Sequence, residues 1–462
     1  MEAVKQKKDF TNGKILKNLI LFAIPMALAT LLQLLFNAAD IAIVGNFGGS
    51  IYQAAVGATS STVHLIVNFF VGLSVGANVI MANAFGAKDV EKQQRVTHAG
   101  IATAIVSGLV IFVIGFSLSR PILQAIGTPA NIIDYSVTYM QIYFLGAPAM
   151  MLYNFGASIM RAVGETKKPL YYLAVSGVVN VVINFITVVF FHLHVIGVAL
   201  GTTISQCVSA VWILYDLSKA QGGEKLDFKK IRFHKEEVKK IIIIGAPMGI
   251  SSCMFSLSNL SVQSAINAYG DMAIAGNTVA SNIEALNSAF DSSLANACVT
   301  FVGQNLGAKK PERVHRIIGA TLVSDVVSLS FLSVLLLLFG RYFCMLFNTD
   351  PIVIDWAIRR LLIVGTAWPL ASIMNGYGSA LRGMGYSVFP MLINLVFTCI
   401  VRVIYVLFIY AQFATKTIEQ LYILYPITWV LSGIVQMITY YIIGKKQGHF
   451  KKKRENGIHS LR

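Results

Sequence analysis

Charged side chains are scarce in this chain of 462 residues. Only 13% of the residues are Asp, Glu, Lys or Arg, whereas 56% are hydrophobic, and the mean hydropathy is +0.68. Charged residues make up about 25% of a typical soluble domain. The low charge content argues against a water-soluble fold of this size and indicates a membrane protein.

Paired cysteines and catalytic clusters are missing as well. The five cysteines form no CxxC pair and fall in or beside apolar stretches, so we expect free thiols and no metal cofactor. No group of His, acidic and Ser residues stands at catalytic spacing near one membrane face, so we predict no enzyme. The cysteines are Cys207, Cys253, Cys298, Cys344 and Cys399.

Long apolar runs are abundant. Each is long enough to cross a hydrocarbon core of about 30 Å at about 1.5 Å per residue. We therefore predict an all-α polytopic membrane protein with 12 transmembrane helices. The runs lie near 15–45, 52–84, 97–119, 132–159, 169–191, 196–218, 241–268, 275–302, 317–340, 353–380, 388–412 and 422–444.

The net charge of +16 could suggest a nucleic-acid partner, but the placement of the basic residues indicates topology instead. With both termini in the cytoplasm, all but six of the 37 Lys and Arg fall in cytoplasmic segments, as the positive-inside rule requires. We expect a multi-pass protein of the cell membrane with no nucleic-acid partner. The six exceptions are Arg120, Arg341, Arg359, Arg360 and Lys416 outside, and Arg402 within a span.

The chain repeats itself at a nearly constant offset. Pro25 corresponds to Pro247 at an offset of 222, and Arg161 corresponds to Arg382 at an offset of 221. Two six-helix bundles of equal orientation, related by a pseudo-twofold axis along the membrane normal, explain this pattern. We expect an N-terminal lobe at 1–218, a basic cytoplasmic linker at 219–240, a C-terminal lobe at 241–444 and a basic cytoplasmic tail at 445–462.

Five segments carry a family resemblance. They are IPMALATLLQLLFNAADIAIVG, GAKDVEKQQR and RAVGETKKP in the first half, and VGQNLGAKKPER and LRGMGYSVFP in the second. In order, spacing and duplication they resemble the MATE family of multidrug and toxic compound extrusion antiporters. The resemblance implies two lobes around a central V-shaped cavity, alternating access, and efflux of amphipathic organic cations coupled to H+ or Na+. We expect the protein to act as a monomer.

Polar residues of the first half recur at helical spacing, and they predict a cation-coupling site. Gln33, Asn37 and Asp40 share one helix face, and Asn180 and Asn184 share another. Thr202 begins the next span at a similar depth, about 8 to 11 Å below the outer boundary. The resemblance implies a first-lobe cation site at Asp40, Asn180 and Thr202. The second acid often found in the family is Asn184 here, which favours H+ over Na+. The alternative is an Asp held by interhelical hydrogen bonds for packing.

The second half has the longest polar face, which lies in the predicted span at 275–302. We predict that Glu284 and Asp291 line a substrate cavity, where they attract an organic cation or form a second coupling site. Arg402 is a candidate counter-ion, and the alternative is a structural Arg–Glu pair. The other residues assigned to this cavity are Gln33, Ser281, Ser288 and Asn259.

The sequence therefore predicts a secondary active multidrug efflux antiporter. The alternative is a lipid-linked oligosaccharide flippase of the same superfamily, which would line its cavity with Arg and Lys to bind pyrophosphate. Arg402 stands alone against several acids, including Asp325. A channel is disfavoured because no filter-like motif is present.

Overall fold

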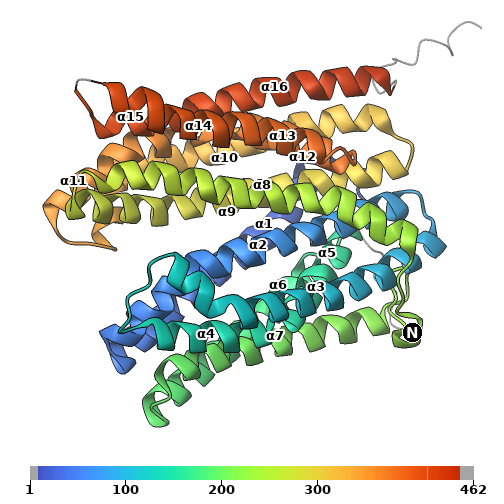
Figure 1. The fold of residues 1–462 in the computed structure, drawn as a ribbon. Helices are drawn as coiled ribbons and strands as arrows, with labels where there is room; N and C mark the ends of the chain where they lie inside the picture. Colours follow the sequence, from blue (N-terminus) through green and yellow to red (C-terminus); the bar gives the residue numbers. More distant parts are fainter. Residues whose placement is uncertain (1–8, 414, 448–462) are drawn as a thin grey trace, which may run out of the picture. The chain divides into compact units, whose positions relative to one another are not determined.

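The computed structural model describes residues 9–413 and 415–447, and all regular secondary structure in these ranges is helical (Figure 1). By length and composition ten of its helices can cross a membrane, or eleven if α4 and α5, which meet at 47°, form one span. The predicted span at 275–302 is a continuous helix of 37 residues, α9, but it is not among the helices that are apolar enough. Its polar face accounts for this difference.

Two compact units divide the chain, and α1 and α8 each contribute to both. One unit contains Ile24–Cys253, and the other contains Phe10–Ala23 and Met254–Arg462. The helices shared between the units are α1 (Ile15–Ile43) and α8 (Lys235–Asn267).

Unit 1 otherwise consists of η1 (Val44–Gly48), α2 (Ser50–Gly86), α3 (Val90–Ala125), α4 (Ile133–Leu145), α5 (Ala147–Ala162), α6 (Lys167–Phe185), η2 (Ile186–Phe190), α7 (His194–Lys219) and η3 (Phe228–Lys230). Unit 2 consists of α9 (Asp271–Gly307), α10 (Pro311–Met345), α11 (Pro351–Arg360), η4 (Leu361–Gly365), α12 (Thr366–Gly383), α13 (Val388–Asn394), η5 (Leu395–Ile400), α14 (Val401–Ile404), η6 (Tyr405–Ile409), η7 (Tyr410–Gln412), α15 (Ile418–Tyr422) and α16 (Leu424–Lys446). The first eight residues and the tail beyond residue 447, which includes most of the predicted basic tail, lie outside the described residues.

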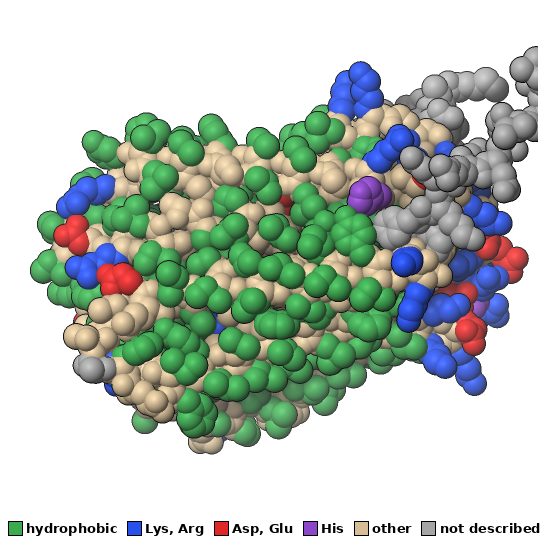
Figure 2. All heavy atoms as spheres, turned by 90° about the horizontal axis from the view of Figure 1, so that it is seen from above, with side chains coloured by type: hydrophobic (Ala, Val, Ile, Leu, Met, Phe, Trp, Pro, Cys, Tyr) green, Lys and Arg blue, Asp and Glu red, His purple; other side chains and the backbone are tan. Residues whose placement is uncertain are grey.

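The surface is that of a protein surrounded by lipid. Hydrophobic side chains cover most of the face drawn in Figure 2, and the Lys, Arg, Asp and Glu visible there gather toward the helix ends. Large apolar side chains such as Phe331, Leu338 and Phe408 are more than half exposed along the predicted spans. Water would disfavour so much continuous apolar surface, whereas a hydrocarbon core favours it.

Aromatic side chains at and just before the start of α1 pack against α9 of unit 2. The ring of Phe10 stacks on Phe301 with centroids 4.1 Å apart, and Phe22 packs edge-on against Phe10. The backbone of Phe10 donates to Gln304 Oε1 at 3.1 Å and accepts from Asn305 Nδ2 at 3.2 Å. These contacts place the first turns of α1 in unit 2.

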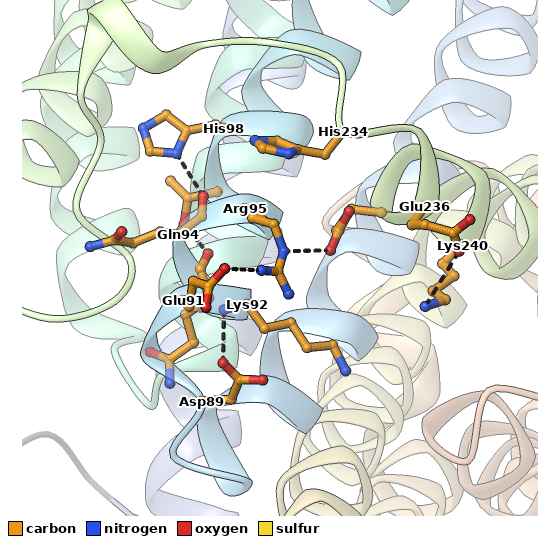
Figure 3. A network of polar contacts seen from close by, with 12 residues as sticks. Asp89, Glu91, Lys92, Gln94, Arg95, His98, His234, Glu236 and Lys240 are labelled. Carbon is orange, nitrogen blue, oxygen red and sulfur yellow. Dashed lines mark hydrogen bonds and ion pairs between the residues drawn. The ribbon is translucent and has the colours of Figure 1, made fainter.

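In unit 1 the predicted linker is tied to the beginning of α3 (Figure 3). The Nε of Arg95 donates to Glu237 Oε1 of α8 at 3.0 Å. The backbone N–H of Asp227 donates to His98 Nε2 at 3.1 Å, while His98 Nδ1 lies 2.7 Å from the carbonyl oxygen of Gln94. The segment between α7 and α8 is therefore held against α3 by charged and backbone contacts.

The first half of α8 approaches α2 through glycines. A Cβ built on Gly72 would lie 2.4 Å from the backbone N of Gly249, and one on Gly76 would lie 2.3 Å from the carbonyl oxygen of Ile241. Backbone atoms cannot move aside as a flexible side chain can. Glycine is therefore required where the two helices cross.

We expect Gly72→Val to lower the stability of the protein in detergent by about 2 kcal/mol or more, because the added methyl groups overlap backbone. Thermal unfolding followed by size-exclusion chromatography measures the change. Gly57→Ala in the same helix is the control, since a Cβ there meets nothing within 4 Å. Equal melting temperatures for the two variants would contradict the role assigned to Gly72.

Candidate substrate and ion sites

Asp40 of α1 is the centre of a compact polar cluster in unit 1. Its side chain is buried, and it accepts hydrogen bonds from Asn184 Nδ2 at 2.5 Å and from Thr202 Oγ1 at 3.3 Å. Asn180 donates to Thr202 at 3.3 Å and accepts from Asn184 at 3.4 Å. Three helices, α1, α6 and α7, thus bring one carboxyl, two amides and one hydroxyl together, as the helical spacing and depth predict.

Local backbone geometry makes room for this cluster. Gly201 lets α7 approach Asn184, because a Cβ at that position would lie 1.9 Å from Asn184 Oδ1. The π-helical turns η1 and η2 begin four residues after Asp40 and two residues after Asn184. Such turns are often found at functional sites in helical proteins. Two of the three helices that carry the polar groups, α1 and α6, are thus irregular beside the site.

The other two residues on the predicted face of α1 are not part of the cluster. Gln33 and Asn37 are exposed, and no hydrogen bond joins either of them to Asp40 in the described part of the chain. Helical periodicity places Gln33 and Asn37 on the same face of α1 as Asp40. However, Asn37 lies about one turn and Gln33 about two turns from Asp40, and neither contacts its carboxyl group.

Glu284 of α9 forms a buried ion pair in unit 2. Arg360 of α11 donates through Nε to Glu284 Oε1 at 3.0 Å and through Nη2 to Oε2 at 2.8 Å. Its Nη1 donates to Asn277 at 2.7 Å, and Asn277 donates in turn to Gln263 of α8 at 2.6 Å. Both charged side chains are less than one-tenth exposed. Glu284 is therefore bound on both oxygens.

This pair corrects two sequence-based predictions. Arg402 is not the counter-ion of Glu284, and Arg360 is not a residue of an outer loop. Because α11 begins at Pro351, Arg360 lies nine residues into the helix, about 13 Å from its start, and reaches Glu284. Arg402 instead contacts Thr428, Asn259 and the ring of Tyr425.

Asp291 belongs to a second buried group in unit 2. Asn375 Nδ2 of α12 donates to Asp291 Oδ2 at 2.5 Å, and the carboxyl group of Asp325 on α10 lies close to that of Asp291. Arg382 of α12 supplies a nearby positive charge. Sequence reasoning noted the acid at 325 but did not place it beside Asp291.

The remaining predicted cavity residues are spread over unit 2. Ser281 is half-buried and donates to the carbonyl oxygen of Asn277, whereas Ser288 and Asn259 are exposed. Of these, the structure brings only Asn259 near a charged group, Arg402, at 3.5 Å. The residues that periodicity places on one face of α9 therefore separate into an ion pair, an acid pair, the half-buried Ser281 and the exposed Ser288.

The polar groups at these sites are of kinds that can bind ions and protons. In the described residues no three His, Cys, Asp or Glu side chains are grouped as metal ligands. Around Asp40 the available groups are one carboxyl, amide and hydroxyl oxygens, which can bind a proton or a small hard cation.

Comparison with known proteins places the chain in a family. The family model MatE matches residues 25–186 and again 247–408, so the two matches are offset by 222 residues. Among curated proteins, the "Probable multidrug resistance protein YoeA" of Bacillus subtilis is 26% identical over 96% of this chain and 97% of its own length. The Staphylococcus aureus (strain MRSA252) multidrug export protein MepA is 24% identical over 81% of this chain and 82% of its own length.

Solved structures show the same fold. An outward-facing multidrug resistance MATE family transporter of the MOP superfamily aligns with a TM-score of 0.89 at 20% identity, over 98% of this chain and 100% of that one. A MOP superfamily transporter from Pyrococcus furiosus aligns with a TM-score of 0.88 at 19% identity, over the same shares of both chains. The predicted internal repeat and family are thereby confirmed: this chain belongs to the MATE family of membrane transporters, with the MatE domain present twice.

Proposed function

We propose that the protein is a secondary active multidrug efflux antiporter that exports amphipathic organic cations in exchange for H+, with Na+ as the alternative coupling ion. The observation that supports it most is the buried carboxyl of Asp40, which is held by Asn184 and Thr202 with no basic partner among the described residues. A carboxyl in such surroundings can take up and release a coupling ion without breaking an ion pair. The names of the relatives YoeA and MepA support the substrate class.

A single carboxyl supports H+ as the coupling ion. Sodium sites in proteins are built from several oxygens, and the amide of Asn184 turns its nitrogen, not its oxygen, toward Asp40. Export by this mechanism needs no cofactor and no catalytic residue. We also propose that the transporter works as a monomer in the cell membrane with both termini in the cytoplasm.

The alternative function, a flippase for lipid-linked oligosaccharides, has less support. A pyrophosphate would need several unpaired Arg or Lys side chains in the cavity. In unit 2 the guanidinium of Arg360 is neutralised by Glu284, and Asp291 lies near Arg382. Two arginines, Arg402 in unit 2 and Arg161 in unit 1, have no acidic neighbour among the described residues, and they belong to different units.

Efflux from proteoliposomes tests the proposal. With a dye cation inside, we expect an imposed pH gradient to drive counterflow of the dye, and a Na+ gradient at equal pH to drive little. The same vesicles without protein report the leak of the dye. If neither gradient changed the rate of dye movement, the antiport proposal would be wrong.

A further inference from the structure

Arg402 is a buried cation that has no acidic partner in residues 9–413 and 415–447. The residue is 1% exposed, and its Nε and Nη2 both donate to the hydroxyl oxygen of Thr428, at 3.0 and 2.9 Å. Its Nη1 has only a long contact of 3.5 Å with Asn259. A guanidinium has five N–H groups, so two remain without an acceptor among the described residues.

The surroundings of Arg402 increase the positive charge. The ring of Tyr425 lies between two guanidinium groups, 4.3 Å from that of Arg402 and 5.3 Å from that of Arg360. Glu284, the acid of this region, is occupied by Arg360 on both oxygens. Both guanidinium groups therefore lie beside one aromatic ring, while the carboxylate of Glu284 pairs with Arg360. A buried charge without a partner is unfavourable, and the missing complement is an anion.

The backbone around Arg402 is irregular on both sides. The four-residue helix α14 that carries it is preceded by the π-helical turn η5 and followed by a second one, η6. Wide turns of this kind occur often at functional sites and rarely in regular spans. Asn259, which provides the weakest contact of the guanidinium, is exposed at the surface of unit 2. Displacement of this one amide would open the free edge of Arg402 to a ligand.

We propose that Arg402 binds the carboxylate of transported compounds, so that this residue determines how well compounds with a carboxylate are carried. The planar fork of an arginine matches a carboxylate in geometry and charge, and the two free N–H groups provide the donors. Thr428 and Tyr425 hold the guanidinium in place while the anion binds. This inference rests on the proposed function, since it concerns which organic compounds are carried.

Two dyes of one ring system test the inference. Rhodamine 110 carries a free carboxylate beside its cationic ring, and rhodamine 123 is its methyl ester without the negative charge. In proteoliposomes we expect Arg402→Gln to reduce rhodamine 110 transport about tenfold or more, the loss typical of a charged hydrogen bond. Rhodamine 123 transport should stay near the wild-type rate. Arg341→Gln, at an arginine that is more than half exposed, is the control and should change neither.

The readouts separate the inference from the proposed function. Dye affinity in detergent, from fluorescence polarisation, should fall for rhodamine 110 alone. Equal losses for both dyes would show a structural role for Arg402, and unchanged rhodamine 110 binding would also overturn the inference. If Arg402→Gln does not fold, Arg402→Lys takes its place, with a smaller but still selective loss. A wild-type protein that exports rhodamine 123 but does not bind rhodamine 110 would contradict the inference and leave the proposed function intact.

Discussion

Asp40→Asn is expected to reduce gradient-driven efflux to the level of protein-free liposomes. Asparagine has the shape of aspartate but cannot take up or release a proton at physiological pH. It can still accept a hydrogen bond from Asn184 or Thr202, so the helices should remain packed. Counterflow of a dye cation against an imposed pH gradient measures the effect. Binding of the same dye in detergent should change little, because the substrate is not expected to contact Asp40.

The control for this experiment keeps the carboxyl group. Asp40→Glu should retain part of the pH-driven transport, since the group can still be protonated. Asn184→Asp adds a second carboxyl 2.5 Å from the first and should increase the response to a Na+ gradient. Asp40→Asn with wild-type efflux would show that the carboxyl serves packing alone, which is the alternative that the sequence left open.

Hydropathy and the internal repeat were sufficient to predict most of the helices. Each apolar run corresponds to one helix or to several consecutive helical segments, such as α4 and α5, which meet at a bend. The weakest case is α9, which was predicted as one of the apolar runs although its polar side chains lower the apolar content. Bends and π-helical turns could not be predicted, because they depend on packing against neighbouring helices and not on composition.

Contacts within the sites could be predicted from the sequence only for residues that lie at the same depth in the membrane. The contact of Asp40 with Asn184 follows from helical spacing and distance to the membrane boundary. Gln33 satisfies the same spacing and yet is exposed, since periodicity selects a side of a helix but not its neighbour. From the sequence, Arg360 was assigned to the outside together with its neighbour Arg359. Arg359 is about half exposed and pairs with Glu419, whereas Arg360 is buried. Consecutive residues of a helix point about 100° apart, so one can be buried while the other is not.

Glu284→Gln is expected to destabilise the protein by about 3 to 5 kcal/mol, the usual cost of removing one partner of a buried ion pair. The loss should be large here because Arg360 would then be an uncompensated charge beside Arg402, with Tyr425 between them. Chemical or thermal unfolding in detergent measures it. The matched control is Asp355→Asn, which breaks the exposed pair with Arg341 and should cost less than about 1 kcal/mol.

The double variant Glu284→Gln with Arg360→Gln decides what the pair is for. If the pair is structural, removal of both charges should recover much of the stability lost in Glu284→Gln, because no buried charge is left without its partner. Transport of a dye cation should recover with it. If Glu284 attracts the cationic substrate, stability should return while transport and dye affinity stay low, since the acid is still absent. The bidentate contact at 2.8 and 3.0 Å favours the structural outcome, because a substrate cation would have to compete with a guanidinium that already occupies both oxygens.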